Sequence, residues 1–188
     1  MRKIIVSEFV SIDGVMEDPG GAEGTVGGPW ARGLTKEGGQ FKFEEVMAAG
    51  ALLLGRVTYE GFAKAWPSMK DEGGFADKMN GMPKYVVSKT LDKAEWNNST
   101  ILRGDVFQEI AKLKQKDGGD ILVNGSAQLV AALMEHNLVD QFRLMIFPVV
   151  LGKGKRMFQE GLDRTTLTLA EVKPMGAVVT LILHPAKT

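Results

Sequence analysis

The strongest constraint on the fold is a repeated change from a short apolar run to a helical pattern, with glycine at the change. In "ALLLGRVTYEGF", residues 51–62, a strand ends at Gly55-Arg56, and helical spacing follows as far as Trp66. In "DILVNGSAQLVAALMEHN", a strand over 120–124 ends at Gly125-Ser126, and another helix follows. Strands that alternate with helices through such short connections predict an α/β fold with a largely parallel sheet.

The other elements extend this pattern. Strands are expected over 3–10, 84–88 and 99–102, and helices over about 41–49 and after Asp105, whose side chain can cap a helix. Residues 14–39 are rich in glycine, proline and charge, and predict one long loop. An ordinary compact domain rarely holds so long a structureless loop unless the loop is functional or mobile.

The C-terminal part changes character, because three expected strands follow one another without helices. They are "QFRLMIFPVV", "TTLTLAEV" and "AVVTLIL", and the last two are joined by Lys173-Pro174-Met175-Gly176. This pattern predicts an antiparallel hairpin added to the edge of the sheet.

Composition excludes several classes of protein. The 188 residues are 44% apolar, which predicts one domain over 1–188. Lysine plus arginine and aspartate plus glutamate both total 23, so we expect no nucleic acid or membrane partner. The absence of cysteine and of any signal-like or membrane-spanning segment favours a cytoplasmic location, and two histidines without further ligands predict no metal site.

The two glycine junctions are candidate anion sites, because a helix N-terminus carries free amides and a partial positive charge. The alternative is that glycine only allows a tight turn, which any α/β protein needs. Arg56 favours a site at the first junction, since a cation at a helix start costs about 0.3–1 kcal/mol unless it faces an anion. A phosphate group would be such an anion.

A third junction, Ser88-Lys89-Thr90, places two hydroxyls and an ammonium after the strand "KYVV". Taken alone, this junction favours a polar turn over a binding site. Three such junctions at one edge of a sheet indicate a long cofactor with several phosphates. The chain lacks the GxxxxGK[ST] and GxGxxG patterns, which disfavours nucleoside triphosphate hydrolysis and an ordinary Rossmann site.

The motifs together resemble a known family. "SIDG", "LLLGRVTYEGF", "KYVVSKTL", "ILVNGS" and "LVDQFRLMIFPVVLGKGKRMF" are similar, in this order, to the dihydrofolate reductase superfamily. The resemblance is greatest to its branch with the C-terminal reductase domain of bacterial riboflavin-biosynthesis proteins. It implies a dihydrofolate reductase-like three-layer α/β/α fold with a mostly parallel mixed sheet, a C-terminal hairpin and NADPH as cofactor. The implied cofactor-binding residues are Val10, Gly14, Gly55, Arg56, Thr58, Ser88, Lys89, Thr90, Asn124, Gly125, Ser126, Ala127 and Gln128.

The substrate side departs from the family pattern. Folate reductases carry an acid about one helix before the Gly-Arg junction, where this chain has Gly38, Gly39 and Gln40, so dihydrofolate is disfavoured as a substrate. The riboflavin reductases have a glutamate before the glycine turn, where this chain has Asn124. Asp13 is the candidate catalytic acid, although an Asx-turn is an equally good explanation of it.

Three further residues are candidate substrate contacts: Ser11, Trp30 and Phe147, the two aromatic ones as stacking groups if they are not part of the core. The resulting hypothesis is an NADPH-dependent oxidoreductase that reduces a small heterocycle, such as 5-amino-6-(5-phosphoribosylamino)uracil. The alternatives are an NADPH-binding module without turnover, and a partner-binding protein in which the junctions are only turns. Exposed edges near "QFRLMIF" and the terminal hairpin predict a homodimer.

Overall fold

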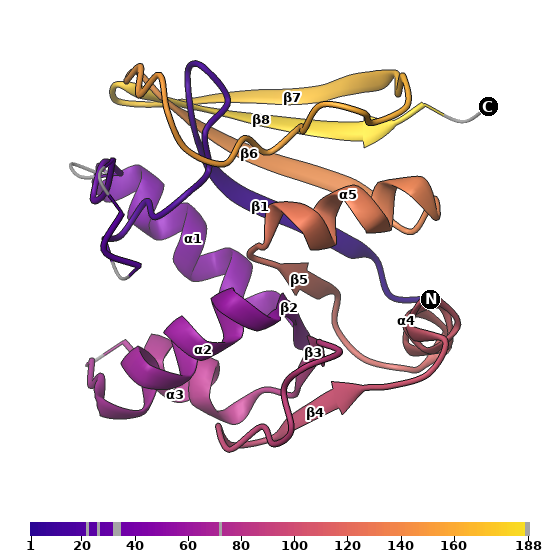
Figure 1. Ribbon diagram of the computed structural model, residues 1–188. Coiled ribbons are helices and arrows are strands. Elements are labelled where there is room, and N and C mark those ends of the chain that lie inside the picture. The colour runs from indigo at the N-terminus through magenta and orange to yellow at the C-terminus, as the bar shows by residue number, and fades with distance from the viewer. Residues whose placement is uncertain (22, 26, 32–34, 72, 187–188) are drawn as a thin grey trace.

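The computed structural model describes residues 1–21, 23–25, 27–31, 35–71 and 73–186, and Figure 1 shows how they are arranged. Strands and helices alternate over the first two thirds of the chain, as the sequence predicts. The strands are β1 Ile4–Ser11, β2 Ala51–Gly55, β3 Lys84–Val87, β4 Ser99–Leu102, β5 Ile121–Val123, β6 Gln141–Phe147, β7 Leu167–Met175 and β8 Val178–Pro185. The helices are α1 Lys36–Ala48, α2 Arg56–Ala65, α3 Phe75–Gly81, α4 Val106–Gln115 and α5 Ala127–Glu135, with a 3-10 turn at Trp66–Ser68.

The strands form one 8-stranded sheet in the order β4-β3-β2-β5-β1-β6-β8-β7. The pairs from β4 to β6 are all parallel, whereas β8 runs antiparallel to both β6 and β7. The predicted mostly parallel sheet with a C-terminal antiparallel hairpin is therefore confirmed.

Helices cover both faces of the sheet, so the three-layer α/β/α arrangement is also confirmed (Figure 1). Strand β2 is buried along its whole length, and its side chains alternate between the two layers. Leu53 packs in the core beneath α4 and α5, whereas Leu52 and Leu54 pack in the core beneath α1, α2 and α3. A strand enclosed on both faces must be apolar throughout, which explains the uninterrupted run of leucines.

The expected loop over 14–39 is wrong at its C-terminal end. Helix α1 already begins at Lys36, and the hydroxyl of Thr35 caps it by accepting a hydrogen bond from the amide of Gly38 at 3.2 Å. Two adjacent glycines weaken a helix locally, and the buried side of α1 outweighs that preference here. Residues 22, 26 and 32–34 of the expected loop lie outside the described part of the chain.

Two expectations about the C-terminal strands also need correction. The turn between them is Gly176-Ala177, and Lys173, Pro174 and Met175 belong to β7. Proline is tolerated there because β7 is an edge strand. Strand β6, the "QFRLMIF" segment, is not an edge, because it lies between β1 and β8.

No helix within the described residues is long and apolar enough to cross a membrane.

Candidate functional site

The two glycine junctions lie against each other at the carboxyl ends of β2 and β5. The amide of Gly55 donates to the carbonyl of Gly125 at 3.3 Å. A Cβ atom at Gly55 would lie 2.5 Å from Oγ of Ser126, and one at Gly125, whose φ is +92°, would lie 2.7 Å from Oγ1 of Thr58. Glycine is therefore required at both positions by this close approach.

Each junction starts a helix without a side-chain cap. Gly55 precedes α2 and Ser126 precedes α5, and neither residue makes a capping hydrogen bond through its side chain. The first-turn amides of both helices are consequently left for water or a ligand. Two helix N-termini that meet at one point add their partial positive charges, which favours an anion between them.

The third junction completes a pocket with a volume of about 250 Å³ at this edge of the sheet. Residues at three strand ends and on α2, α4 and α5 line it. The lining residues are Gly55, Arg56, Val57, Val87, Ser88, Lys89, Thr90, Phe107, Ser126, Gln128, Leu129 and Ala132. Seven residues predicted to bind a cofactor are thus brought together, and Thr58, Asn124, Gly125 and Ala127 are chain neighbours of this lining.

The cations at the pocket mouth are available to a ligand to different degrees. Arg56 forms a 2.9 Å ion pair with Glu60 one turn along α2, with both side chains nearly half exposed. The predicted need of Arg56 for an anion is therefore met within the helix. Lys89 and Thr90 are exposed, and the hydroxyl of Ser88 accepts hydrogen bonds from the amides of Thr90 and Leu91.

Asp13 and Ser11 tie two loops together after β1. The carboxylate of Asp13 accepts hydrogen bonds from the Ser11 hydroxyl at 2.7 Å and from the amides of Gly152 and Leu151 at 2.8 and 3.1 Å. These contacts, led by the Ser11 hydroxyl, lower the pKa of Asp13 to about 2. Asp13 is therefore a carboxylate at neutral pH and orders the chain, which does not suit it to donate a proton. Gly14 follows with φ +85°, and Val10 is buried in the core.

The two aromatic candidates for substrate stacking pack against each other. Phe147 is 3% exposed and makes edge contacts with Phe9 and Trp30, with ring centroids 5.3 and 5.6 Å apart. The indole N–H of Trp30 donates to the carbonyl of Glu17 at 2.7 Å. Phe147 is thus a core residue in this structure, and Trp30 is half-buried beside it.

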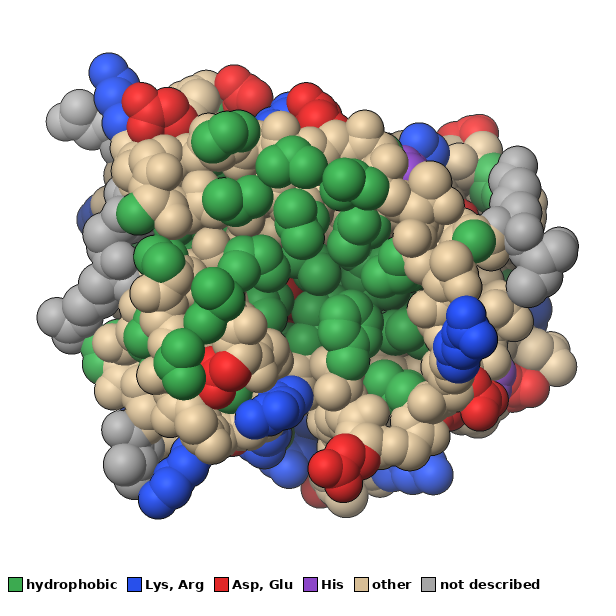
Figure 2. All heavy atoms as spheres, turned by 90° about the horizontal axis from the view of Figure 1, so that it is seen from above, with side chains coloured by type: hydrophobic (Ala, Val, Ile, Leu, Met, Phe, Trp, Pro, Cys, Tyr) green, Lys and Arg blue, Asp and Glu red, His purple; other side chains and the backbone are tan. Residues whose placement is uncertain are grey.

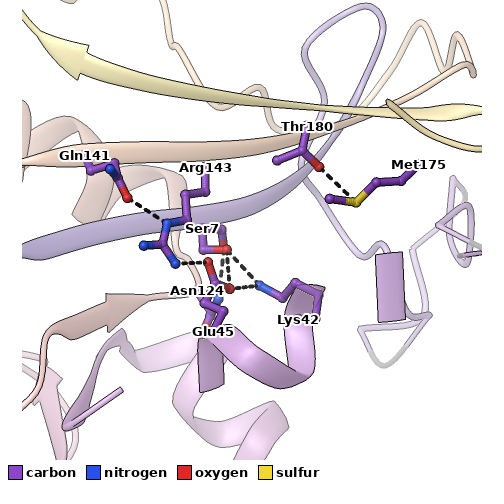
Figure 3. A network of polar contacts seen from close by, with 8 residues as sticks. All are labelled: Ser7, Lys42, Glu45, Asn124, Gln141, Arg143, Met175 and Thr180. Carbon is purple, nitrogen blue, oxygen red and sulfur yellow. Dashed lines mark hydrogen bonds and ion pairs between the residues drawn. The ribbon is translucent and has the colours of Figure 1, made fainter. Parts of the chain in front are cut away.

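A buried ionic network that the sequence analysis missed lies between α1 and the middle of the sheet (Figure 3). The carboxylate of Glu45, on α1, pairs with Lys42 and with Arg143 of β6, and it accepts a hydrogen bond from Ser7 of β1 at 2.7 Å. Burial opposes ionisation of Glu45, but Lys42, Ser7 and Arg143 together hold its pKa below the usual value. Glu45 and Arg143 also line a second, more open hollow of about 510 Å³ beside β7.

Glu8, next to Ser7 on β1, is a second buried acid that the sequence analysis missed. The residue is buried, with 8% of its surface exposed, and Oε1 has no hydrogen-bond partner among the described residues. Burial raises the pKa of Glu8 from 4.5 to about 8, against the opposing effects of Lys42 and of a hydrogen bond from the Gly125 amide. The polar pair Ser7-Glu8 inside an apolar strand was the available signal for both buried centres.

Comparison with known proteins identifies the family. The model of the RibD C-terminal domain matches residues 2–181. The chain belongs to this family. A curated relative, the uncharacterized protein YyaP of Bacillus subtilis, is 29% identical over 187 residues, which cover 97% of this chain and 95% of the relative.

Solved structures agree on the fold. A candidate riboflavin biosynthesis protein from Shewanella sp. PV-4 has a TM-score of 0.76 at 18% identity, covering 98% of this chain and 99% of that one. Dihydrofolate reductase from Enterococcus faecalis, solved in complex with NADP(H), has a TM-score of 0.60 at 16% identity, covering 98% and 97%. The RibD C-terminal family resemblance and the dihydrofolate reductase-like fold expected from the sequence are both confirmed.

The pocket residues fit a phosphorylated dinucleotide. Two uncapped helix N-termini, two hydroxyls, Lys89 and Arg56 all favour anionic oxygen atoms.

Proposed function

We propose that this protein is an NADPH-dependent reductase of a small heterocyclic substrate. The observation that carries the proposal is the pocket in which three strand-to-helix junctions meet, with the uncapped N-termini of α2 and α5 at its wall. Membership of the RibD C-terminal family supports the same conclusion, as does the likeness to a reductase that was solved with NADP(H).

In this proposal the phosphates of the cofactor lie on the first turns of α5 and α2, held by backbone amides. Lys89, with the hydroxyls of Ser88 and Thr90, binds the additional phosphate that distinguishes NADPH from NADH. Arg56 turns from Glu60 toward this phosphate, to which a guanidinium can donate two hydrogen bonds. The pocket of about 250 Å³ holds the adenosine half of the dinucleotide.

The other half of the cofactor extends past Gly125 toward the C-terminal half of β1. Strand β5 pairs with β1 only as far as Val6, whereas β6 pairs with β1 as far as Ser11. The β1 segment from Glu8 to Ser11 therefore lies beyond the end of β5, where open α/β sheets bind their ligands. The bound cofactor would supply the hydride, and the chain would orient both reactants and exclude water.

The proposed substrate class is supported by the family and by the residues at the start of α1. Gly38, Gly39 and Gln40 lie in the first turns of α1, and the acid that α1 does bury, Glu45, is already paired with Lys42 and Arg143. Dihydrofolate is therefore a poor candidate, and a ribosylated aminopyrimidine such as 5-amino-6-(5-phosphoribosylamino)uracil is the better one.

Self-association and location belong to the same proposal. On one face of the C-terminal strands the pairing register aligns three apolar rows: Phe142, Leu183 and Leu169; Leu144, Leu181 and Val172; and Ile146, Val179 and Pro174. The β7 members of these rows are exposed, and Figure 2 shows apolar side chains gathered over the β7–β8 end of the molecule. We propose that this apolar face forms a homodimer, and that the enzyme acts in the cytoplasm.

The test is consumption of NADPH in the presence of a panel of aminopyrimidine, pterin and related heterocycles. Steady consumption with one of them, and at least tenfold weaker use of NADH, is the expected result. Lys89→Ala should reduce the preference for NADPH without changing the affinity for NADH. Binding of NADPH without consumption for any heterocycle would instead indicate a binding module without turnover.

A further inference from the structure

Glu8 does not line the pocket, yet it lies beside Gly125, on which the N-termini of α2 and α5 both depend. Strand β5 pairs with β1 as far as Val123 and Val6, and the side chain of Asn124 donates to the carbonyl of Ser7 at 2.8 Å. Gly125, the next residue, therefore lies beside Glu8, and its backbone amide is one of the groups that lower the pKa of Glu8. The carbonyl of Gly125 accepts from the amide of Gly55, and its Cα is packed against Thr58 of α2. Ser126, the next residue, lines the pocket and starts α5. Glu8 thus lies against the turn that positions both helix ends.

The placement of Glu8 is costly for the fold, which calls for an explanation. A buried carboxyl group with an unpaired oxygen destabilises the folded protein in either protonation state, more strongly when it is ionised. Proteins retain such groups mainly at functional sites. A leucine or a glutamine at this position of β1 would avoid the charge.

The charge on Glu8 decides how well the neighbouring turn can bind phosphate. An ionised carboxylate beneath the start of α5 would attract the Gly125 amide and repel a phosphate group above it. The neutral acid still accepts from Gly125 and carries no repelling charge. The charged groups that act on Glu8 are Lys42 and Glu45, both on α1; Lys42 lowers the pKa of Glu8 and has the larger effect, whereas Glu45 raises it.

We infer that Glu8 is a positioning residue of the dinucleotide site, which supports phosphate binding as a neutral acid and weakens it when ionised. This inference rests on the proposed cofactor. Because an anionic ligand stabilises the protonated form of Glu8, binding takes up a proton in the range where Glu8 titrates. Binding is therefore strongest below that range and weakens as the pH rises through it.

The first measurement is the Kd for NADPH between about pH 7 and pH 9. If the bound state requires neutral Glu8 with a pKa of about 8, the Kd of the wild-type protein rises about tenfold over this range. In Glu8→Gln, which keeps the shape and cannot ionise, the Kd should change by less than about twofold. The matched control is Glu60→Gln, which removes the exposed carboxylate paired with Arg56 and should keep the pH dependence of the wild-type protein.

The second measurement needs no variant. Calorimetric titration with NADPH at about pH 8, in two buffers with different ionisation enthalpies, should show uptake of about half a proton per ligand. If no NADPH binds at any pH, the proposed function fails and this inference fails with it. If NADPH binds without proton uptake, or with the same pH dependence in Glu8→Gln, only the inference about Glu8 is overturned.

Discussion

Burial of Glu8 makes the stability of the protein depend on pH in an unusual direction. Its pKa is about 8 in the folded protein and 4.5 when exposed, so folding favours the protonated acid. The contribution of protonated Glu8 to the free energy of unfolding is fully present below about pH 4.5 and is lost as the pH rises toward 8. Most carboxyl groups in proteins act in the opposite sense, because their folded-state pKa values are lowered.

We therefore predict that Glu8→Gln stabilises the protein at neutral pH. At 1.36 kcal/mol per pKa unit, the gain in the free energy of unfolding at pH 7 is up to about 3 kcal/mol, and it should nearly vanish at pH 4.5. Urea unfolding of both proteins at the two pH values measures it. Equal stability of the two proteins at pH 7 would show that Glu8 is not buried as an acid.

Asp13 has the opposite behaviour. Three hydrogen bonds, led by the one from Ser11, lower its pKa to about 2, so its contribution to stability is present above about pH 4 and lost as the pH falls toward 2. We predict that Asp13→Asn lowers the urea midpoint at pH 7 and speeds hydrogen exchange at the amides of Leu151 and Gly152. Unchanged exchange at these amides would contradict the role of Asp13 in joining the two loops.

The residues of the site were predictable from sequence to different degrees. The sequence predicts Gly55 and Gly125 as junction residues, because an apolar run changes to helical spacing there. The close packing of the two junctions explains why both residues are glycine. The pair Ser7-Glu8 interrupts an apolar strand and signals a polar feature there, but the sequence does not tell whether Glu8 or Glu45 faces solvent or a neighbouring element. The sequence likewise does not tell whether the ring of Phe147 faces the core, where the structure places it, or a ligand.

At the scale of elements, substitutions on helix α2 test whether the pocket binds NADPH. Arg56 is paired with Glu60 in the structure, and cofactor binding would exchange this partner for a phosphate. We predict that Arg56→Ala weakens NADPH binding about tenfold, the equivalent of one charge-assisted hydrogen bond, and leaves the fold intact. Calorimetry with NADPH measures this change.

Glu60→Ala is the matched control on the same helix. It frees the guanidinium of Arg56 and should leave the affinity unchanged or raise it. If Arg56→Ala and Glu60→Ala both bind NADPH like the wild-type protein, then Arg56 only forms an ion pair within α2. The junction at Gly55 is in that case a turn and not a phosphate site.

Most elements follow from local sequence, and the exceptions have physical causes. The β2–α2 and β5–α5 units were evident because apolar runs, glycine junctions and helical spacing agree there. The start of α1 at Lys36 was obscured by Gly38 and Gly39, which disfavour a helix in isolation and are outweighed by packing against the sheet. The interior position of β6 depends on sheet order, which pairing between distant segments decides.

At the scale of the whole molecule, the apolar face on β8 and β7 predicts self-association. Sedimentation should give a mass twice the 20.4 kDa of one chain. Val172→Asp, which places a charge at an exposed position of this face, should shift the protein to monomers without unfolding it. Met47→Asp, at a similarly exposed apolar residue on α1, should remain a dimer.

A monomeric wild-type protein at all concentrations would contradict the proposed dimer. Dissociation by Met47→Asp but not by Val172→Asp would place the interface on another face, near α1.

The pocket at the carboxyl ends of β2, β3 and β5 is the centre of this account, and calorimetric titration of the protein with NADPH tests it most directly. We predict saturation at one NADPH per chain with a Kd in the micromolar range, about −8 kcal/mol. If no binding heat is seen up to roughly 1 mM NADPH at several temperatures, the Kd is above about 1 mM and the binding free energy is weaker than about −4 kcal/mol. That result would contradict the proposed cofactor.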